Sequence, residues 1–91
     1  MTATKVQAKT LTVSGNVTVT DGVLIATGTG ADTSSVGSLT LNNASGVVGE
    51  LTAGATTLSN GSSLSAEKLI MSGDLTVGSN ADTKGGTTLV V

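Results

Sequence analysis

Aliphatic and hydroxylated residues alternate along short stretches of this chain. In each stretch a Thr stands between two residues such as Leu and Val. Because successive side chains of a strand point to opposite faces, one face of each stretch is apolar and the other carries hydroxyl groups. The pattern predicts short β-strands and an all-β fold. It is clearest at Leu11–Val13, Val17–Val19, Leu39–Leu41 and Leu75–Val77.

Turn-forming residues separate these stretches. Gly, Asn, Asp and Ser favour tight turns, and β-branched residues and Gly interrupt any helical period. The best helical candidate, Ser65–Leu69, is therefore interpreted as an extended segment. Turns are expected at Ser14–Asn16, Asp21–Gly22, Asn42–Asn43, Asn60–Gly61, Ser72–Asp74 and Gly85–Gly86.

Leucines recur every five to seven residues in the second half of the chain, at Leu51, Leu58, Leu64, Leu69 and Leu75. This spacing is too short for helical hairpins, but it suits short strands that turn a corner about every six residues. In β-helices and β-prisms such strands stack in rungs with their aliphatic residues inside. The sequence predicts a short-stranded β-helix or β-prism-like repeat fold.

Two pairs of segments repeat each other. The run LTVSGNVTV at 11–19 reappears as LIMSGDLTV at 69–77, and GTGADT at 28–33 reappears as GSNADT at 78–83. Each copy of the second pair is followed, after the same interval, by another aliphatic stretch. Repetition of this kind indicates one strand–turn–strand–loop unit that is used twice.

The chain is expected to form one domain. We place a β-repeat domain at 9–91, with related units at 11–41 and 69–91, after an N-terminal arm at 1–8. A chain of 91 residues buries only a thin core. With no Cys and no His, neither disulfides nor a zinc site can add stability, so we expect copies of the chain to associate.

Four aliphatic residues break the alternation, because each stands beside an apolar neighbour that is assigned to the core. They are predicted to point outward and to contribute to contacts between subunits, although each could also be an ordinary exposed aliphatic residue. These residues are Leu24, Val48, Ile70 and Val90.

Charge and composition exclude several partners. The chain has a net charge of −2, four Lys, no Arg and no aromatic residue. It therefore lacks the basic patch and the stacking platform that nucleic-acid binding requires. The longest clean aliphatic run, Val23–Ala26, is far too short to span a membrane, and Met1–Lys9 lacks a signal-peptide core. We expect a protein made in the cytoplasm that binds neither nucleic acid nor membranes.

Catalysis is not expected. Ser14 and Ser72 have no His to accept their protons, and Glu50 and Glu67 have no aromatic sugar-binding surroundings. The fragment Gly28–Gly30 lacks the Lys of a phosphate-binding loop. These residues are interpreted as turn residues and solvated charges, and no cofactor is predicted.

The Asp residues of the two Ala-Asp-Thr repeats are candidate Ca²⁺ ligands. Asp32 and Asp82 occupy matching positions, and Asp21, Asp74 and Asn80 could add oxygens. No dense calcium-binding loop is present, and Asp before Thr commonly bonds its own backbone in a turn. The turn role is the favoured interpretation, so no metal site is predicted.

The runs LTAGATTLSNGSSL at 51–64, LTVSGNVTV at 11–19 and GDLTVG at 73–78 resemble the repeats of tailed-phage fibre and spike shafts. The likeness covers roughly 9–77 and is one of low-complexity composition. It implies a homotrimer whose three chains wrap into a β-helix or β-prism. The chain is expected to lack a tip domain of the kind that reads a receptor.

The resemblance implies a structural protein of a bacteriophage virion, either a head decoration (cement) protein or a short head or tail fibre, completed by homotrimerisation. Its partners would be copies of itself and the major capsid protein or another virion protein. Lys5, Val6 and Lys9 could form a strap onto an acidic capsid, although a frayed terminus is the favoured interpretation of the arm. The alternatives are a polymerising scaffold similar to bactofilins and a surface- or ice-binding solenoid with rows such as Thr18 and Thr20. The irregular intervals between Thr residues disfavour the last alternative.

Overall fold

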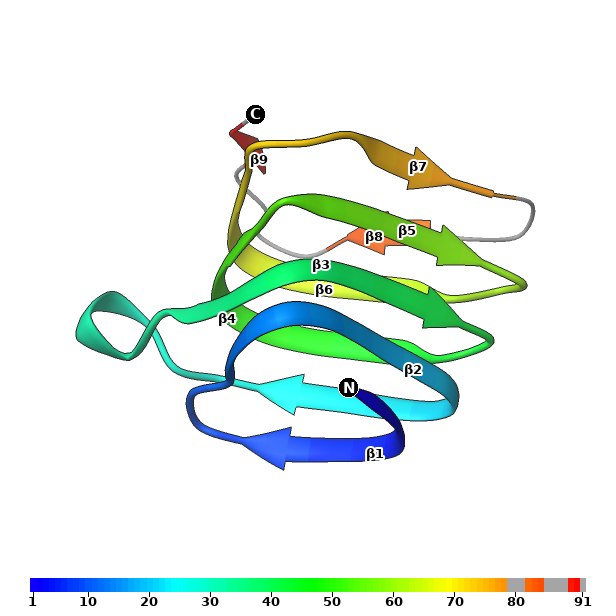
Figure 1. Ribbon diagram of the computed structural model, residues 1–91, viewed down its shortest axis with the longest axis horizontal. Coiled ribbons are helices and arrows are strands. Elements are labelled where there is room, and N and C mark those ends of the chain that lie inside the picture. Colours follow the sequence, from blue (N-terminus) through cyan, green and yellow to red (C-terminus); the bar gives the residue numbers. More distant parts are fainter. Residues whose placement is uncertain (79–81, 85–88, 91) are drawn as a thin grey trace.

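The computed structural model describes residues 1–78, 82–84 and 89–90, which form a parallel β-solenoid of about four turns (Figure 1). The predicted all-β repeat fold is confirmed, and the extended conformation of Ser65–Leu69 is confirmed within β6. One short 3-10 helix, η1, spans Gly30–Asp32. The strands are β1 Thr2–Ala8, β2 Thr12–Ala26, β3 Ser34–Asn42, β4 Ser45–Ala53, β5 Ala55–Ser59, β6 Ser63–Met71, β7 Leu75–Val77, β8 Asp82–Lys84 and β9 Leu89–Val90.

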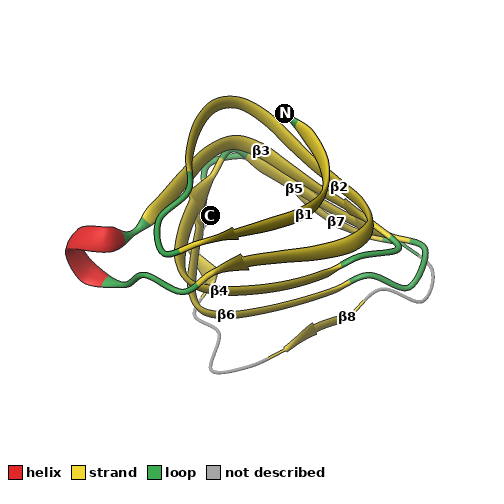
Figure 2. Cartoon of the chain, turned by 90° about the horizontal axis from the view of Figure 1, so that it is seen from below, coloured by secondary structure: helices red, strands yellow, loops and turns green. Residues whose placement is uncertain are grey.

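The solenoid has a triangular cross-section, visible in the view from the end where β1 lies (Figure 2). Long strands bend at the corners, so β2 alone contributes to all three sides. We name the sides by the segments that stack on them. Face A contains 2–3, 16–20, 38–42, 55–59 and 75–77. Face B contains 5–8, 23–26, 45–48, 63–66 and 82–84. Face C contains 12–13, 34–36, 51–53, 69–71 and 89–90.

The register of the ladders confirms that the chain turns a corner about every six residues. Leu41 pairs with Leu58 and Gly46 with Leu64, so these turns take 17 and 18 residues for three faces. The turn that contains η1 is longer, since Thr12 pairs with Ser35. Its extra residues are accommodated in the loop between β2 and β3, and the strands on either side keep their pairing.

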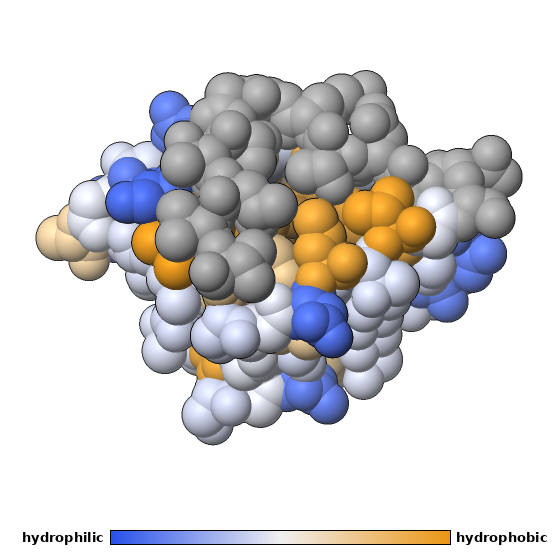
Figure 3. Space-filling view, turned by 90° about the horizontal axis from the view of Figure 1, so that it is seen from above, coloured by the Kyte–Doolittle hydropathy of each residue, from blue (hydrophilic) through white to orange (hydrophobic). Residues whose placement is uncertain are grey.

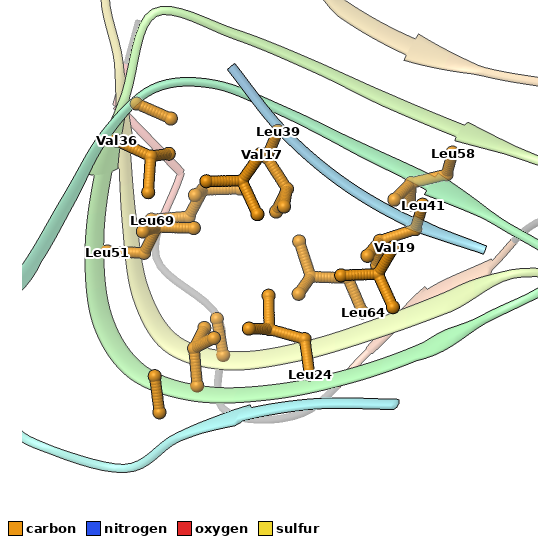
Figure 4. Close-up of a cluster of buried hydrophobic side chains, with 14 of the residues drawn as sticks. Val17, Val19, Leu24, Val36, Leu39, Leu41, Leu51, Leu58, Leu64 and Leu69 are labelled. Carbon is orange, nitrogen blue, oxygen red and sulfur yellow. The ribbon is translucent and has the colours of Figure 1, made fainter. Parts of the chain in front are cut away.

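The aliphatic residues of all three faces meet inside the solenoid (Figure 4). Leu51, Leu58, Leu64 and Leu69 lie on faces C, A, B and C in turn, and none is more than 2% exposed. The regular leucine spacing therefore records one buried Leu for each side of the triangle. A single chain closes this core, whereas trimerisation stays a prediction.

The repeated unit is one turn, not the longer unit predicted to occur twice. Val17, Leu39, Thr56 and Leu75 stack in one inward column of face A. The segments 11–19 and 69–77 resemble each other because they occupy the same two faces of turns that lie three turns apart. The Ala-Asp-Thr copies are not equivalent, since Asp32 ends η1 while Asp82 begins β8 on face B.

Residues 1–8 do not form a separate arm. The strand β1 pairs in parallel with β2 and supplies the first strand of face B, where Val6 is buried. The predicted boundary at residue 9 is therefore wrong. Ladder pairing and burial of an alternate aliphatic residue make this segment part of the solenoid.

The corner between faces A and B is built from predicted turn residues. Asp21, Asn43 and Asn60 all have positive φ angles, which Asn and Asp tolerate better than other residues with side chains. The Asn43 amide donates to Asp21 Oδ1 at 2.8 Å, one turn below. The predicted turns at Asp21–Gly22, Asn42–Asn43 and Asn60–Gly61 are therefore confirmed as one stacked corner.

Candidate functional site

The two carboxylates singled out in the sequence lie on neighbouring turns and have different surroundings. Glu50 is half-buried and accepts a hydrogen bond from Thr33 Oγ1 at 3.2 Å, while its ladder partner on the next turn is Lys68. Glu67 is exposed at the edge of face B. Ser14 and Ser72 are exposed near the corner between faces C and A. Glu50 is thus engaged with Thr33, while Glu67 faces the solvent.

Two of the candidate calcium ligands, Asp21 and Asp32, serve local contacts. Asp32 forms an ion pair with Lys9 at 3.2 Å, and Asp21 accepts a hydrogen bond from Asn43. Asn80 lies outside the described residues. In the part of the chain that the structure describes, no group of three or more His, Cys, Asp or Glu residues could hold a metal ion.

Face A presents hydroxyl groups in register. Thr2, Thr18, Thr40, Thr57 and Thr76 pair successively across the turns and form one outward column. Strands in a sheet lie about 4.8 Å apart, so the hydroxyl groups repeat at that interval. The sequence intervals between these residues differ because the corners and the η1 loop hold different numbers of residues.

Face B carries an aliphatic cluster that the sequence interpretation missed. Val23, Ile25 and Val47 point outward, with Ile25 paired directly to Val47. Val47 is 48% exposed, and Val23 and Ile25 are half-buried. Beside them lies a shallow hollow of about 230 Å³, lined by Thr27, Val47, Val48, Gly49, Ser65, Ala66 and Glu67.

Two of the four predicted outward residues point inward. Leu24 and Val48 are 1% and 4% exposed and belong to the core, so their predicted orientation is wrong. Their neighbours Val23 and Val47 take the outward positions. Ile70 is half-buried between buried Leu69 and Met71, as expected for an outward residue of face C. For Val90 the structure describes the backbone pairing with Ile70 and not the side chain.

The proposed capsid strap has a different geometry from that expected. Lys5 and Lys9 are exposed, but the Val6 side chain points into the core and is not available to a partner in this conformation. The Met1 amino group donates to the Asn16 carbonyl at 2.7 Å, which ties the first residue to the next turn. A docking contact at this end would use the two Lys side chains.

Hydrophobic residues also reach the surface at the end of the solenoid where β7 lies (Figure 3). In β7, Leu75 is half-buried and Val77 is 48% exposed.

Among the described residues, no helix is long and apolar enough to cross a membrane. Comparison with protein families, with curated proteins and with solved structures gives no match to this chain.

Proposed function

We propose that this chain is a non-enzymatic structural module that works as an assembly of copies, as a bacteriophage head decoration protein or a short fibre. The observation that carries self-association is the aliphatic cluster of Val23, Ile25 and Val47 on the outside of face B. Aliphatic groups that adjoin one another on a surface favour burial against a partner. The proposal that the chain belongs to a virus particle depends on the resemblance of its sequence to fibre shafts.

A solenoid suits this role because its ladders hold each face rigidly. Among the described residues, every strand pairing is parallel and joins neighbouring turns, so the outward side chains keep fixed positions. A decoration protein would use one face for its own copies and another surface for the capsid. We propose Lys5 and Lys9 as the contacts to an acidic capsid protein, since both are exposed at the first turn.

Solution mass tests the assembly. Light scattering over a range of dilutions is expected to give a small, fixed number of chains of 8.7 kDa each, three if the resemblance to fibre shafts extends to stoichiometry. Mass that grows with concentration would support the bactofilin-like filament instead. A single chain at every concentration would contradict both proposals.

The aligned column of face A supports a second candidate, a module that binds an ordered surface such as ice. Irregular sequence intervals no longer count against it, since Thr18, Thr40 and Thr57 stand in register. We expect a purified sample to slow ice recrystallisation, and Thr40→Lys to abolish the effect because its long charged side chain breaks the flat array. Activity that survives this substitution, or its absence in the unsubstituted chain, would remove this candidate.

A further inference from the structure

The turn that joins β5 to β6 contains the one Asn-Gly pair of the sequence, Asn60–Gly61. It lies at the corner between faces A and B, at the right of Figure 1. Both residues are exposed, and their φ angles of 56° and 80° are left-handed. The Ser62 amide donates to the Ser59 carbonyl at 3.3 Å, which closes the turn around them. The backbone nitrogen of Gly61 is unusually open to reaction, because glycine has no Cβ to shield it.

We propose that Asn60 is a site of spontaneous deamidation in the folded protein. The deprotonated Gly61 nitrogen forms a bond to Asn60 Cγ. The bond from Cγ to Nδ2 breaks, and the released nitrogen takes up a proton and leaves as ammonia. The product is a five-membered succinimide. Water then opens this ring at the backbone carbonyl carbon to give isoaspartate, or at Cγ to give aspartate, and it is the only other reactant.

Asn43 provides a comparison within the same molecule. It lies at the same corner, one turn before Asn60, and its φ angle of 52° is nearly the same. The Asn60 amide donates to Asn42 Oδ1 at 2.6 Å. In the same way, the Asn43 amide donates to Asp21 Oδ1 at 2.8 Å. The backbone and side-chain restraints on these two asparagines are therefore alike.

The two sites differ in the backbone nitrogen that follows the asparagine. After Asn43, the Ala44 amide donates to Ser62 Oγ at 3.1 Å, and Ala44 is buried. After Asn60, the Gly61 N–H has no hydrogen-bond partner among the described residues and lies at the surface. The nitrogen that must attack is thus occupied and enclosed at one site, and free at the other.

The corner conformation slows the reaction without preventing it. Left-handed residues have ψ near about +47°. At that angle the Gly61 nitrogen and Asn60 Cβ lie on opposite sides of the Cα–C bond, whereas ring closure needs them on the same side. Asn60 must therefore leave its left-handed conformation and release Asn42 before it reacts. This is the opening of one exposed turn, which costs less free energy than unfolding of the whole chain.

The products differ from the original corner in charge and in length. Either product has a carboxylate where Asn60 had an amide, which adds one negative charge to the −2 of the unmodified chain. Isoaspartate also places one more methylene group in the main chain between Ser59 and Ser62. The modified protein can therefore be separated by ion exchange and located by peptide mapping.

Incubation of the folded protein at mildly alkaline pH tests the site, with peptide mapping by mass spectrometry and enzymatic methylation of isoaspartate as the readouts. Conversion is expected at Asn60 and not at Asn43. The product should contain isoaspartate, which direct hydrolysis of the side chain does not give. In urea, Asn60 should convert at least about tenfold faster, because the unfolded chain does not have to open the turn.

Two variants separate the side-chain restraint from the state of the following nitrogen. Asn42→Ala removes the acceptor of the Asn60 amide, and conversion of the folded chain should rise about threefold, as expected for the loss of one weak hydrogen bond. The matched control, Asp21→Gly, removes the acceptor of the Asn43 amide and accepts a positive φ angle. Asn43 should still stay intact, because its following amide remains bound and buried. Circular dichroism confirms that each variant keeps its fold.

An Asn60 that stays intact in the folded chain while it converts in urea would overturn the proposal. Conversion of Asn43 as fast as Asn60 would show that the following nitrogen does not select the site. Equal rates for Asn60 with and without urea would overturn the protective role of the corner. An Asn42→Ala variant that converts no faster than the unsubstituted chain would remove the side-chain bond from this account.

Discussion

Replacing Gly54 with Ala is expected to destabilise the solenoid by roughly 1–3 kcal/mol or more, and Gly15→Ala is expected to leave it intact. Both residues belong to a glycine stack at the corner between faces C and A. The Gly54 amide donates to the Gly37 carbonyl at 2.8 Å, and a Cβ on Gly54 would lie 2.3 Å from that oxygen. Because the obstacle is backbone, the two turns must separate to admit a methyl group.

Gly15 is the matched control, since in the described part of the chain no heavy atom beyond its two chain neighbours lies within 4 Å of the Cβ it would gain. Its substitution should be neutral or stabilising by about 0.4–1 kcal/mol, because Ala restricts the unfolded chain. Urea unfolding followed by circular dichroism measures both variants. Equal stabilities for the two would show that the turns are less closely stacked than the structure describes.

Thr56→Val is expected to raise the free energy of unfolding by about 1–3 kcal/mol. Thr56 is fully buried in the inward column of face A, and its hydroxyl oxygen has no hydrogen-bond partner among the described residues. Leu39 and Leu75 pair with it on the neighbouring turns, so its surroundings offer aliphatic groups to a Val side chain of the same shape. Valine removes the unsatisfied group without opening a cavity.

The control for this substitution is the next residue in the chain. Thr57 points outward in the hydroxyl column of face A, and Thr57→Val should change the unfolding free energy by no more than about 0.5 kcal/mol. Both changes keep a β-branched side chain, so strand propensity is matched. A Thr56→Val variant that unfolds at lower urea concentration than the unsubstituted protein would contradict the prediction.

The turn length and much of the core could be predicted from the sequence. The leucine spacing indicates the number of residues per face because each successive buried Leu lies on the next side of the triangle. These residues are Leu51, Leu58, Leu64 and Leu69. Turn residues such as Asn43 and Asn60 were identifiable because few other residues accept a positive φ angle. Both features depend on neighbouring residues alone, so they can be identified without knowledge of the fold.

The direction of side chains could not be predicted across corners. Alternation places Val48 inward on face B, yet the next buried residue with a side chain is Leu51, an odd number of residues later. A corner such as this one interrupts the alternation, and a count from one strand into the next then assigns the wrong side. The sequence therefore predicted Leu24 and Val48 as outward residues, whereas the outward residues are their neighbours Val23 and Val47.

The alignment of side chains between turns could not be predicted from the sequence for a similar reason. Thr18 and Thr40 are 22 residues apart whereas Thr40 and Thr57 are 17 apart, although all three stand in one column. Only the three-dimensional pairing reveals that the corners absorb the difference. The hydroxyl column of face A and the aliphatic cluster of face B therefore depend on the register, which no single stretch of sequence contains.

The loop that holds η1 shows how such a molecule can acquire new parts. It lengthens one turn between β2 and β3 while Val17 still pairs with Leu39 and Ile25 still pairs with Val47. Peptides grafted at this corner would project sideways from the rod without altering its pitch. A scaffold of this design can diversify in what it displays while the spacing of everything else stays constant.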